Sequence, residues 1–241
     1  LIRIPYFQGA LSDVPYSTIP LGVIVKGEWI ITVSRWQNDI IQEFASGRIR
    51  NLSTSKRNRF LLRMLLSVAT KYLSYLREIN RAVDSLEDQL QLSMRNKEVL
   101  DLLKFQKCLV YFTTALKGNE LLMERLQRSQ LFRTYPDDED LLEDVITENQ
   151  QAIEMVNISS NILSSMMDAF ASIISNNLNV VMKFLASVTI VLSLPTIVTS
   201  YFGMNVTLPF QEHPLAYLII IAIFLGLSII VILIFLKRDW F

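Results

Sequence analysis

The chain has 241 residues, with 23 basic and 23 acidic side chains, so its formal net charge is zero. This balance gives no indication of nucleic-acid binding. One cysteine, Cys108, and one histidine, His213, exclude a disulfide framework and argue against a Cys/His metal site within one chain. The chain begins with LIRIPYF, which reads like the middle of a strand, so we expect further residues before Leu1.

The N-terminal part predicts a small β structure followed by helices. Residues 21–34 contain two β-branched runs joined at Lys26–Gly27, which is typical of a hairpin. Apolar side chains then recur at helical spacing from residue 56 to about residue 91. A polar break precedes a second helix over residues 97–129, which Gly118 interrupts. Two long helices with a short link predict an antiparallel helical hairpin.

The next helical pattern is much longer. It begins at Pro136, where Asp137 and Asp138 lie at the positive end of the helix dipole. It continues to Phe202 without glycine and with Pro195 as its single internal proline. This predicts one helix of about 66 residues, roughly 100 Å long, that runs without a linker into a membrane span.

Two uncharged apolar runs, residues 184–202 and 215–236, are each long enough to cross a hydrocarbon core of about 30 Å. Lys183 precedes the first run, and Lys237–Arg238 follow the second. The loop between the runs, GMNVTLPFQEHP, has no lysine or arginine. The positive-inside rule therefore predicts that both termini lie in the cytoplasm and the loop outside. We expect a multi-pass protein of the plasma membrane.

A polar stripe follows one face of the long helix at alternating spacings of three and four residues. Its members are Asp144, Thr147, Gln151, Glu154, Ile158, Asn161, Ser165, Asp168, Ser172, Ser175, Asn179, Met182, Ala186, Thr189, Ser193, Thr196 and Ser200. Outside the membrane, a solvated face is the simpler interpretation. Within it, single hydroxyls can bond back to their own helix, but four on one face favour a water-filled axis or a close helix interface.

Charge is segregated along the chain. Residues 137–182 carry nine acidic and no basic side chains, whereas residues 47–133 carry 17 basic and 8 acidic ones. Several copies of the acidic helix around an axis would concentrate cations. Pairing of the acidic helix with basic helices of its own chain explains the balance equally well. Because one two-span chain cannot enclose a pore, a channel requires a ring, with the second span facing lipid.

The stripe ends at Gly203, Met204 and Asn205, which we interpret as the outer mouth. Glycine permits the chain to turn out of the helix, and the asparagine contributes amide and carbonyl oxygens. Mg²⁺ prefers oxygen ligands and gives up water reluctantly, so a neutral ring that binds its hydration shell suits a first capture step. The stripe has no cysteine or histidine, which favours Mg²⁺ over softer metals.

The motif YFGMN between two C-terminal spans, the tail KRDWF and the segment NVVMKFL (179–185) resemble the CorA family of magnesium channels. The segments YLSYLREINRAVDSLEDQL and KFQKCLVYFTTALKGNELLMERL also resemble helices of this family, so the likeness covers nearly the whole chain. It implies a homopentamer with a funnel-shaped cytoplasmic domain and a pore lined by the long helix. A related branch that exports zinc has isoleucine in the tripeptide, so Met204 argues against zinc export.

The resemblance also implies roles for individual residues. Asn205 and Gly203 fall at the selectivity mouth, and Asp144 matches a regulatory metal-binding carboxylate between subunits, with Asp39 and Glu43 as candidate partners. Thr196, Asn179 and Asp168 match pore-lining positions, and the polar stripe adds Ser193, Thr189 and Ser200 to the expected pore lining. Met182 and Leu185 form the expected hydrophobic gate. Glu212 is the candidate cation attractor, in a loop that reads TLPFQEHP where the family often has Met-Pro-Glu-Leu.

The expected fold class is a membrane α-helical protein with a cytoplasmic α+β domain, a stalk helix continuous with the first span, and a two-helix membrane hairpin in a homopentameric funnel. The expected divisions are 1–55, the remnant of an N-terminal cytoplasmic α/β domain; 56–135, a cytoplasmic helical hairpin; 136–203, the stalk helix and first span; 204–214, an extracellular loop; 215–236, the second span; and 237–241, a basic cytoplasmic tail.

These features predict a channel for Mg²⁺ influx, with Co²⁺ or Ni²⁺ as further permeant ions. Mg²⁺ is expected both as the transported ion and as the regulatory ligand, bound between subunits on the cytoplasmic side. The expected partners are membrane lipid, divalent cations and further copies of the chain, in a pentamer, but no nucleic acid. The alternative is a membrane-anchored coiled-coil scaffold or sensor without transport. Without a nucleophile–base pair or a phosphate-binding glycine loop, we do not expect an enzyme.

Overall fold

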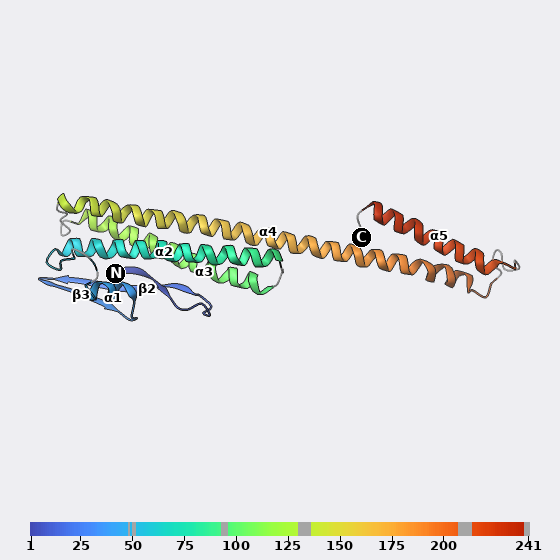
Figure 1. The fold of residues 1–241 in the computed structure, drawn as a ribbon, viewed down its shortest axis with the longest axis horizontal. Coiled ribbons are helices and arrows are strands. Elements are labelled where there is room, and N and C mark those ends of the chain that lie inside the picture. The colour runs from blue at the N-terminus through green and yellow to red at the C-terminus, as the bar shows by residue number, and fades with distance from the viewer. Residues whose placement is uncertain (48, 50–51, 93–95, 130–135, 207–213, 239–241) are drawn as a thin grey trace. The chain divides into compact units, whose positions relative to one another are not determined.

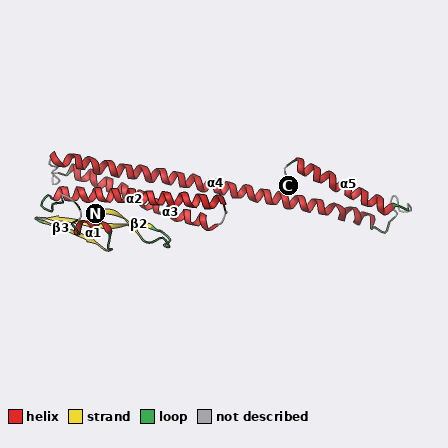
Figure 2. Cartoon of the chain, in the orientation of Figure 1, coloured by secondary structure: helices red, strands yellow, loops and turns green. Residues whose placement is uncertain are grey.

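The structure is a computed structural model that describes residues 1–47, 49, 52–92, 96–129, 136–206 and 214–238 (Figure 1). It forms two compact units, Leu1–Asp168 and Ala169–Phe241, which are described separately. Helices predominate in both, and strands occur only in the first among the described residues (Figure 2). The elements in chain order are β1 (Ile2–Phe7), β2 (Tyr16–Lys26), β3 (Trp29–Ser34), α1 (Asp39–Ala45), α2 (Arg57–Leu92), α3 (Asn96–Arg128), α4 (Pro136–Phe202) and α5 (Ala216–Lys237).

The three strands form an antiparallel sheet in the order β1-β2-β3. The expected hairpin is confirmed, because β2 pairs with β3 in a register that places Lys26 opposite Trp29. Gly27 occupies the turn with φ +55°, a left-handed conformation that glycine adopts without strain. The hairpin therefore owes its position to a single glycine between two β-branched runs.

One face of the sheet packs on the helical hairpin of α2 and α3. Ile4 of β1 and Leu21 of β2 are fully buried, as are Tyr72 of α2 and Phe112 of α3. The rings of Tyr72 and Phe112 meet edge to face with centroids 5.0 Å apart, a favoured arrangement for aromatic pairs. This apolar layer is the core of the first unit.

Within the first unit, α4 runs alongside the helical hairpin (Figure 1). The side chain of Asn149 donates to the Leu116 carbonyl oxygen at 3.5 Å, and Gln106 donates to the Ser164 hydroxyl at 3.3 Å. Position along α4 rises as position along α3 falls, so these two helices are antiparallel. Since α2 and α3 form an antiparallel pair, α2 and α4 run parallel.

The second unit consists of the C-terminal part of α4 together with the whole of α5. Among the described residues, α4 and α5 are the two helices long and apolar enough to cross a membrane. Each expected helix is present with bounds that differ from the prediction by one residue at most. The observed helices are Arg57–Leu92, Asn96–Arg128, Pro136–Phe202 and Ala216–Lys237.

Two local features differ from the expectation. α3 continues through Gly118 as one helix, so this residue does not interrupt it. The short helix α1 was not predicted. It begins after Asn38, whose side-chain oxygen accepts the Ile41 N–H at 2.9 Å, a regular N-cap.

Candidate functional site

The polar stripe of α4 lies on the exposed side of the helix. All its members from Asp144 to Ser200 are exposed, apart from the half-buried Ser193. The buried positions of α4 in the first unit instead repeat on another face, and they are Asp138, Leu141, Val145, Asn149, Ala152, Val156, Ser159, Leu163 and Met166. From Val145 onward they lie alternately one and two residues after the stripe, which averages about 150° around the helix. The chain's own core therefore leaves the stripe uncovered.

The same relationship holds within the second unit, where residues of α4 and α5 line a common groove. Val191 of α4 and Ile232 of α5 are both among its lining residues. Val191 is two residues from both Thr189 and Ser193, which is about 160° around the helix. In both units, the partners from the same chain occupy the side of α4 away from the stripe.

The stripe hydroxyls within the apolar run bond to their own helix. Thr189 donates to the Leu185 carbonyl oxygen and Ser193 to that of Ile190, each at 2.8 Å. Thr196 makes a longer bond of 3.5 Å to the Leu192 carbonyl oxygen. A hydroxyl that donates its proton keeps two lone pairs on its oxygen. These side chains therefore present hydrogen-bond acceptors on the exposed face.

The tripeptide directly follows the last turn of α4. The Gly203 N–H donates to the Thr199 carbonyl oxygen at 2.9 Å, continuing the helical pattern. Gly203 does not have the positive φ found at Gly9, Gly27 and Gly47 among the described residues. A Cβ at Gly203 would instead lie 3.2 Å from that Thr199 oxygen, tighter than an ordinary contact. A side chain at this position would thus require the Thr199 carbonyl to shift by a few tenths of an ångström, and Gly203 does not adopt the left-handed backbone that ends many helices.

Met204 and Asn205 are both exposed after this turn. They follow the end of an exposed, acceptor-bearing face, and their role as a mouth stays a prediction because a mouth needs several copies of the chain. Glu212, the expected cation attractor, lies outside the described residues.

The expected gate lies in the most exposed stretch of α4. Every residue from 171 to 186 is exposed, so no part of the described chain covers α4 on any side there. Met182 and Leu185 are 57% and 58% exposed, and Asn179 lies one turn before Met182 on the stripe. Large apolar side chains exposed around a helix indicate contact with other molecules or with lipid.

Asp144 and Asp168 both lie on the exposed face of α4. The described residues hold no group of three or more His, Cys, Asp or Glu side chains that could bind a metal. The regulatory role of Asp144 therefore stays a prediction, since the described part of one chain brings no such group of ligands around it.

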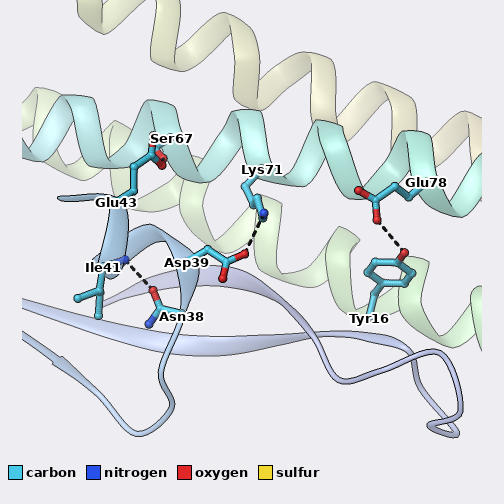
Figure 3. Close-up of polar contacts among 8 residues, drawn as sticks. All are labelled: Tyr16, Asn38, Asp39, Ile41, Glu43, Ser67, Lys71 and Glu78. Carbon is cyan, nitrogen blue, oxygen red and sulfur yellow. Dashed lines mark hydrogen bonds and ion pairs between the residues drawn. The ribbon is translucent and has the colours of Figure 1, made fainter. Parts of the chain in front are cut away.

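The candidate partners of Asp144 are both engaged within their own chain (Figure 3). The Asp39 carboxylate pairs with the Lys71 ammonium at 3.0 Å, and Glu43 accepts from the Ser67 hydroxyl at 3.5 Å. Burial acts to lower the pKa of Lys71, but its bond to Asp39 and the neighbouring Tyr75 outweigh this and raise that pKa. Asp39 therefore holds α1 to α2.

Sequence reasoning missed two hydroxyl residues of the first apolar run. Ser187 is fully buried and donates to the Lys183 carbonyl oxygen at 2.8 Å. Thr199 donates to the Pro195 carbonyl oxygen at 2.9 Å. Neither lies on the stripe, and nothing in the pattern of the apolar run distinguishes the side that α5 covers.

The chain matches a family model described as CorA-like Mg²⁺ transporter protein over residues 1–238. It is similar to the cobalt/magnesium transport protein CorA of Methanocaldococcus jannaschii, at 29% identity over 97% of this chain and 75% of the relative. It is also similar to the protein of the same name from Thermotoga maritima, at 26% identity over 79% of this chain and 55% of that relative.

The fold has a solved counterpart. The complete structure of the CorA magnesium transporter from Methanocaldococcus jannaschii matches with a TM-score of 0.86 and 24% identity, over all of this chain and 76% of that one. The soluble domain of the same protein matches with a TM-score of 0.60, over 69% of this chain and 66% of that one. The arrangement of a soluble domain, a long helix and a C-terminal apolar helix is thus shared.

Proposed function

Because this chain belongs to the CorA-like Mg²⁺ transporter family, we propose that it forms a channel through which Mg²⁺ enters the cell as a hydrated ion. The observation that carries the proposal is the exposed stripe of α4, which presents hydroxyl acceptors and leads to Gly203, Met204 and Asn205. An anchor or scaffold would have no need of polar atoms on the exposed face of a span.

The channel is a ring of chains, in the proposed arrangement a pentamer, with copies of the stripe facing a common axis. Two features support this. One two-span chain cannot surround a pore, and residues 171–186 are exposed on every side, including large apolar side chains that need a partner. In this ring α5 lies outside and faces lipid, because its surface is apolar all round.

The ion passes with its water shell in place. The outer hydrogens of water around a cation are donors, and the stripe offers acceptors to them. Mg²⁺ holds its water more firmly than larger divalent ions, so a site that reads the shell suits it. Co²⁺ and Ni²⁺ are further proposed ions, and the names of both CorA relatives support cobalt.

The chain is placed in the plasma membrane with both termini in the cytoplasm. Lys183 lies before the first span, and Lys237 and Arg238 follow the second, which supports this orientation. Residues 1–183 are then cytoplasmic, and the tripeptide faces the outside.

Cytoplasmic Mg²⁺ closes the channel. Ions bound between subunits at Asp144 neutralise facing carboxylates and hold the ring together, and their loss allows like charges to separate the subunits. Met182 and Leu185 form the gate, where a narrow apolar ring stops ions by excluding water. The exposure of all three side chains supports these roles.

The test is Mg²⁺ influx into liposomes that contain the full chain and a Mg²⁺-sensitive dye. We expect influx with the wild type, and its loss in Asn205→Ala with the oligomer intact. Asn177→Ala is the matched control, because Asn177 is exposed on α4 but two residues from the stripe members Ser175 and Asn179. Undiminished influx in Asn205→Ala would contradict the role of Asn205 at the mouth of the channel. If the wild type shows no influx even when internal Mg²⁺ is chelated, the result would favour a membrane-anchored scaffold without transport.

A further inference from the structure

A groove between the two apolar helices of the second unit is lined only by hydrocarbon. Its lining residues are Val188, Val191 and Leu192 of α4 with Ile232 and Leu236 of α5, around a volume of about 380 Å³. Leu192 and Leu236 are more than half exposed, so the groove is open to the surroundings of the helices. Its volume lies within the range of small-molecule sites, but its walls offer no polar group to a polar ligand.

Among the described residues, the charges around this groove are of one sign; Asp239, which follows Arg238 in the sequence, lies outside them. In the described part of the second unit, residues 169–206 and 214–238, the charged side chains are Lys183, Lys237 and Arg238, and none is acidic. Lys237 directly follows the groove residue Leu236. Lys183 precedes Val188 by five residues, about 7.5 Å along the helix. All three cations are exposed at the same end of the groove.

We propose that the groove binds an acyl chain of an anionic phospholipid, whose phosphate is held by Lys183, Lys237 and Arg238. Long basic side chains at span ends extend their charge to the headgroup level while their stems stay in apolar surroundings. The cations then have a phosphate to neutralise them, and the groove is filled by hydrocarbon.

A second copy of the chain is a poorer occupant. A neighbouring span would bring apolar side chains to the groove but no acid to the three cations, because the described part of the spans has none. Each basic residue near a membrane surface favours anionic lipid by about 1 kcal/mol. This is about a fivefold preference for each cation.

The inference rests on the membrane placement in the proposed function but not on ion flow. Lipid binding is measured without a Mg²⁺ gradient, so its outcome is separate from that of the influx assay. A chain that fails to conduct can still hold its lipid, and a conducting chain can lack lipid preference.

The experiment uses lipid vesicles containing the full chain and brominated lipids, which quench tryptophan on contact. Trp29, Trp36 and Trp240 are replaced by phenylalanine, and Val188→Trp places a reporter in the groove. We expect brominated phosphatidylglycerol to quench it with at least fivefold higher apparent affinity than brominated phosphatidylcholine. Ile223→Trp is the control, since Ile223 is exposed on α5 nine residues before the groove and is expected to show no preference.

Adding Lys183→Gln and Arg238→Gln is expected to remove the preference at the groove reporter. Equal quenching by both lipids in the parent protein would overturn the proposal. Absence of quenching by either lipid would overturn it too, because a second copy of the chain then fills the groove.

A second measurement leaves the groove and the tryptophans unchanged. The phosphatidylglycerol that stays with the purified full chain in detergent is determined per chain, for the wild type and for Lys183→Gln/Lys237→Gln/Arg238→Gln. We expect retention to fall at least fivefold in the triple variant. Equal retention in the two proteins would contradict the headgroup site.

Discussion

The side-chain amide of Asn119 on α3 pairs with both backbone groups of Arg3 on β1. The Arg3 N–H donates to Asn119 Oδ1, and Asn119 Nδ2 donates to the Arg3 carbonyl oxygen, each at 2.8 Å. β1 is an edge strand of the described sheet, and these two backbone groups lie on the side of β1 that faces away from β2. One buried amide thus replaces the missing neighbour strand and fixes the sheet to the helices.

Replacing Asn119 with alanine is therefore expected to destabilise the first unit. Asn119 is 2% exposed, and the variant leaves the Arg3 N–H without this partner, whereas the Arg3 carbonyl oxygen still accepts from the Tyr72 hydroxyl at 3.1 Å. An unpaired N–H costs about 1–3 kcal/mol, and we expect a loss of about that size in the free energy of unfolding. Urea unfolding of the detergent-solubilised chain measures it. Asn157→Ala, at an exposed position of α4, is the control, and equal stability of both variants would refute the pairing role.

The single cysteine reports on the same interface. Cys108 is fully buried, and its sulfur accepts the Tyr16 N–H of β2 at 3.4 Å. Burial raises the pKa of its thiol, although the N–H bond opposes this. The native protein is thus expected to react with a maleimide at pH 8 at least tenfold more slowly than the unfolded chain.

Detachment of the sheet removes this protection. We expect Asn119→Ala to label faster than the wild type at the same pH, because its sheet opens more often. The raised pKa of the Cys108 thiol also affects stability. The contribution of this thiol to the free energy of unfolding is present below its unfolded-state pKa and is lost as the pH rises through its folded-state pKa. Fast labelling of the folded wild type would show that Cys108 is accessible.

Arg59 and Asp138 fix the start of α4. The guanidinium of Arg59 on α2 is ion-paired with the Asp138 carboxylate, which is 1% exposed. Removal of Arg59 leaves a buried carboxylate without its charge partner, and we expect Arg59→Ala to cost about 3 kcal/mol. The double variant Arg59→Met/Asp138→Leu is expected to recover most of this loss. Urea unfolding compares the three proteins, and a double variant as unstable as Arg59→Ala would contradict this account.

Asp144 carries the proposed control by cytoplasmic Mg²⁺. We expect Asp144→Ala to conduct but to need about five- to tenfold more internal Mg²⁺ for closure, a typical size for coupling between sites. Liposome influx at graded internal Mg²⁺ measures the shift. Glu143→Ala is the matched control, because Glu143 is exposed one residue away and off the stripe. If closure of Asp144→Ala depends on internal Mg²⁺ as in the wild type, the regulatory site would have to consist of other carboxylates.

The parts of the fold that the sequence predicts best are those in which a helical pattern repeats over many residues. The bounds of α4 follow from Pro136 and from the lack of glycine up to Phe202. The polar stripe of α4 is exposed because it repeats on a different side of the helix from the buried positions. Helix α1 was missed because seven residues are too few for a period to show, although its cap residue Asn38 was a usable signal.

Other parts could not be predicted for physical reasons. α5 is apolar on all sides, so no pattern marks the side that faces α4. The burial of Ser187 on α4 likewise has no signal in the sequence pattern. The space around Gly203 depends on the direction of the Thr199 carbonyl, which the amino-acid sequence does not specify. The proposed ring would join separate chains, so its contacts would lie between copies and outside any pattern within one sequence.

Thr189 and Ser193 donate their hydroxyl protons to backbone carbonyl oxygens of their own helix, and this has a consequence for anions. Water around chloride or phosphate turns its hydrogens inward and its oxygens outward, so a hydrated anion looks for donors in the wall around it. A wall of these hydroxyls has already given its protons to the helix backbone and has only oxygen lone pairs left. The spans would therefore discriminate by the sign of the ion's charge without holding a charged side chain of their own.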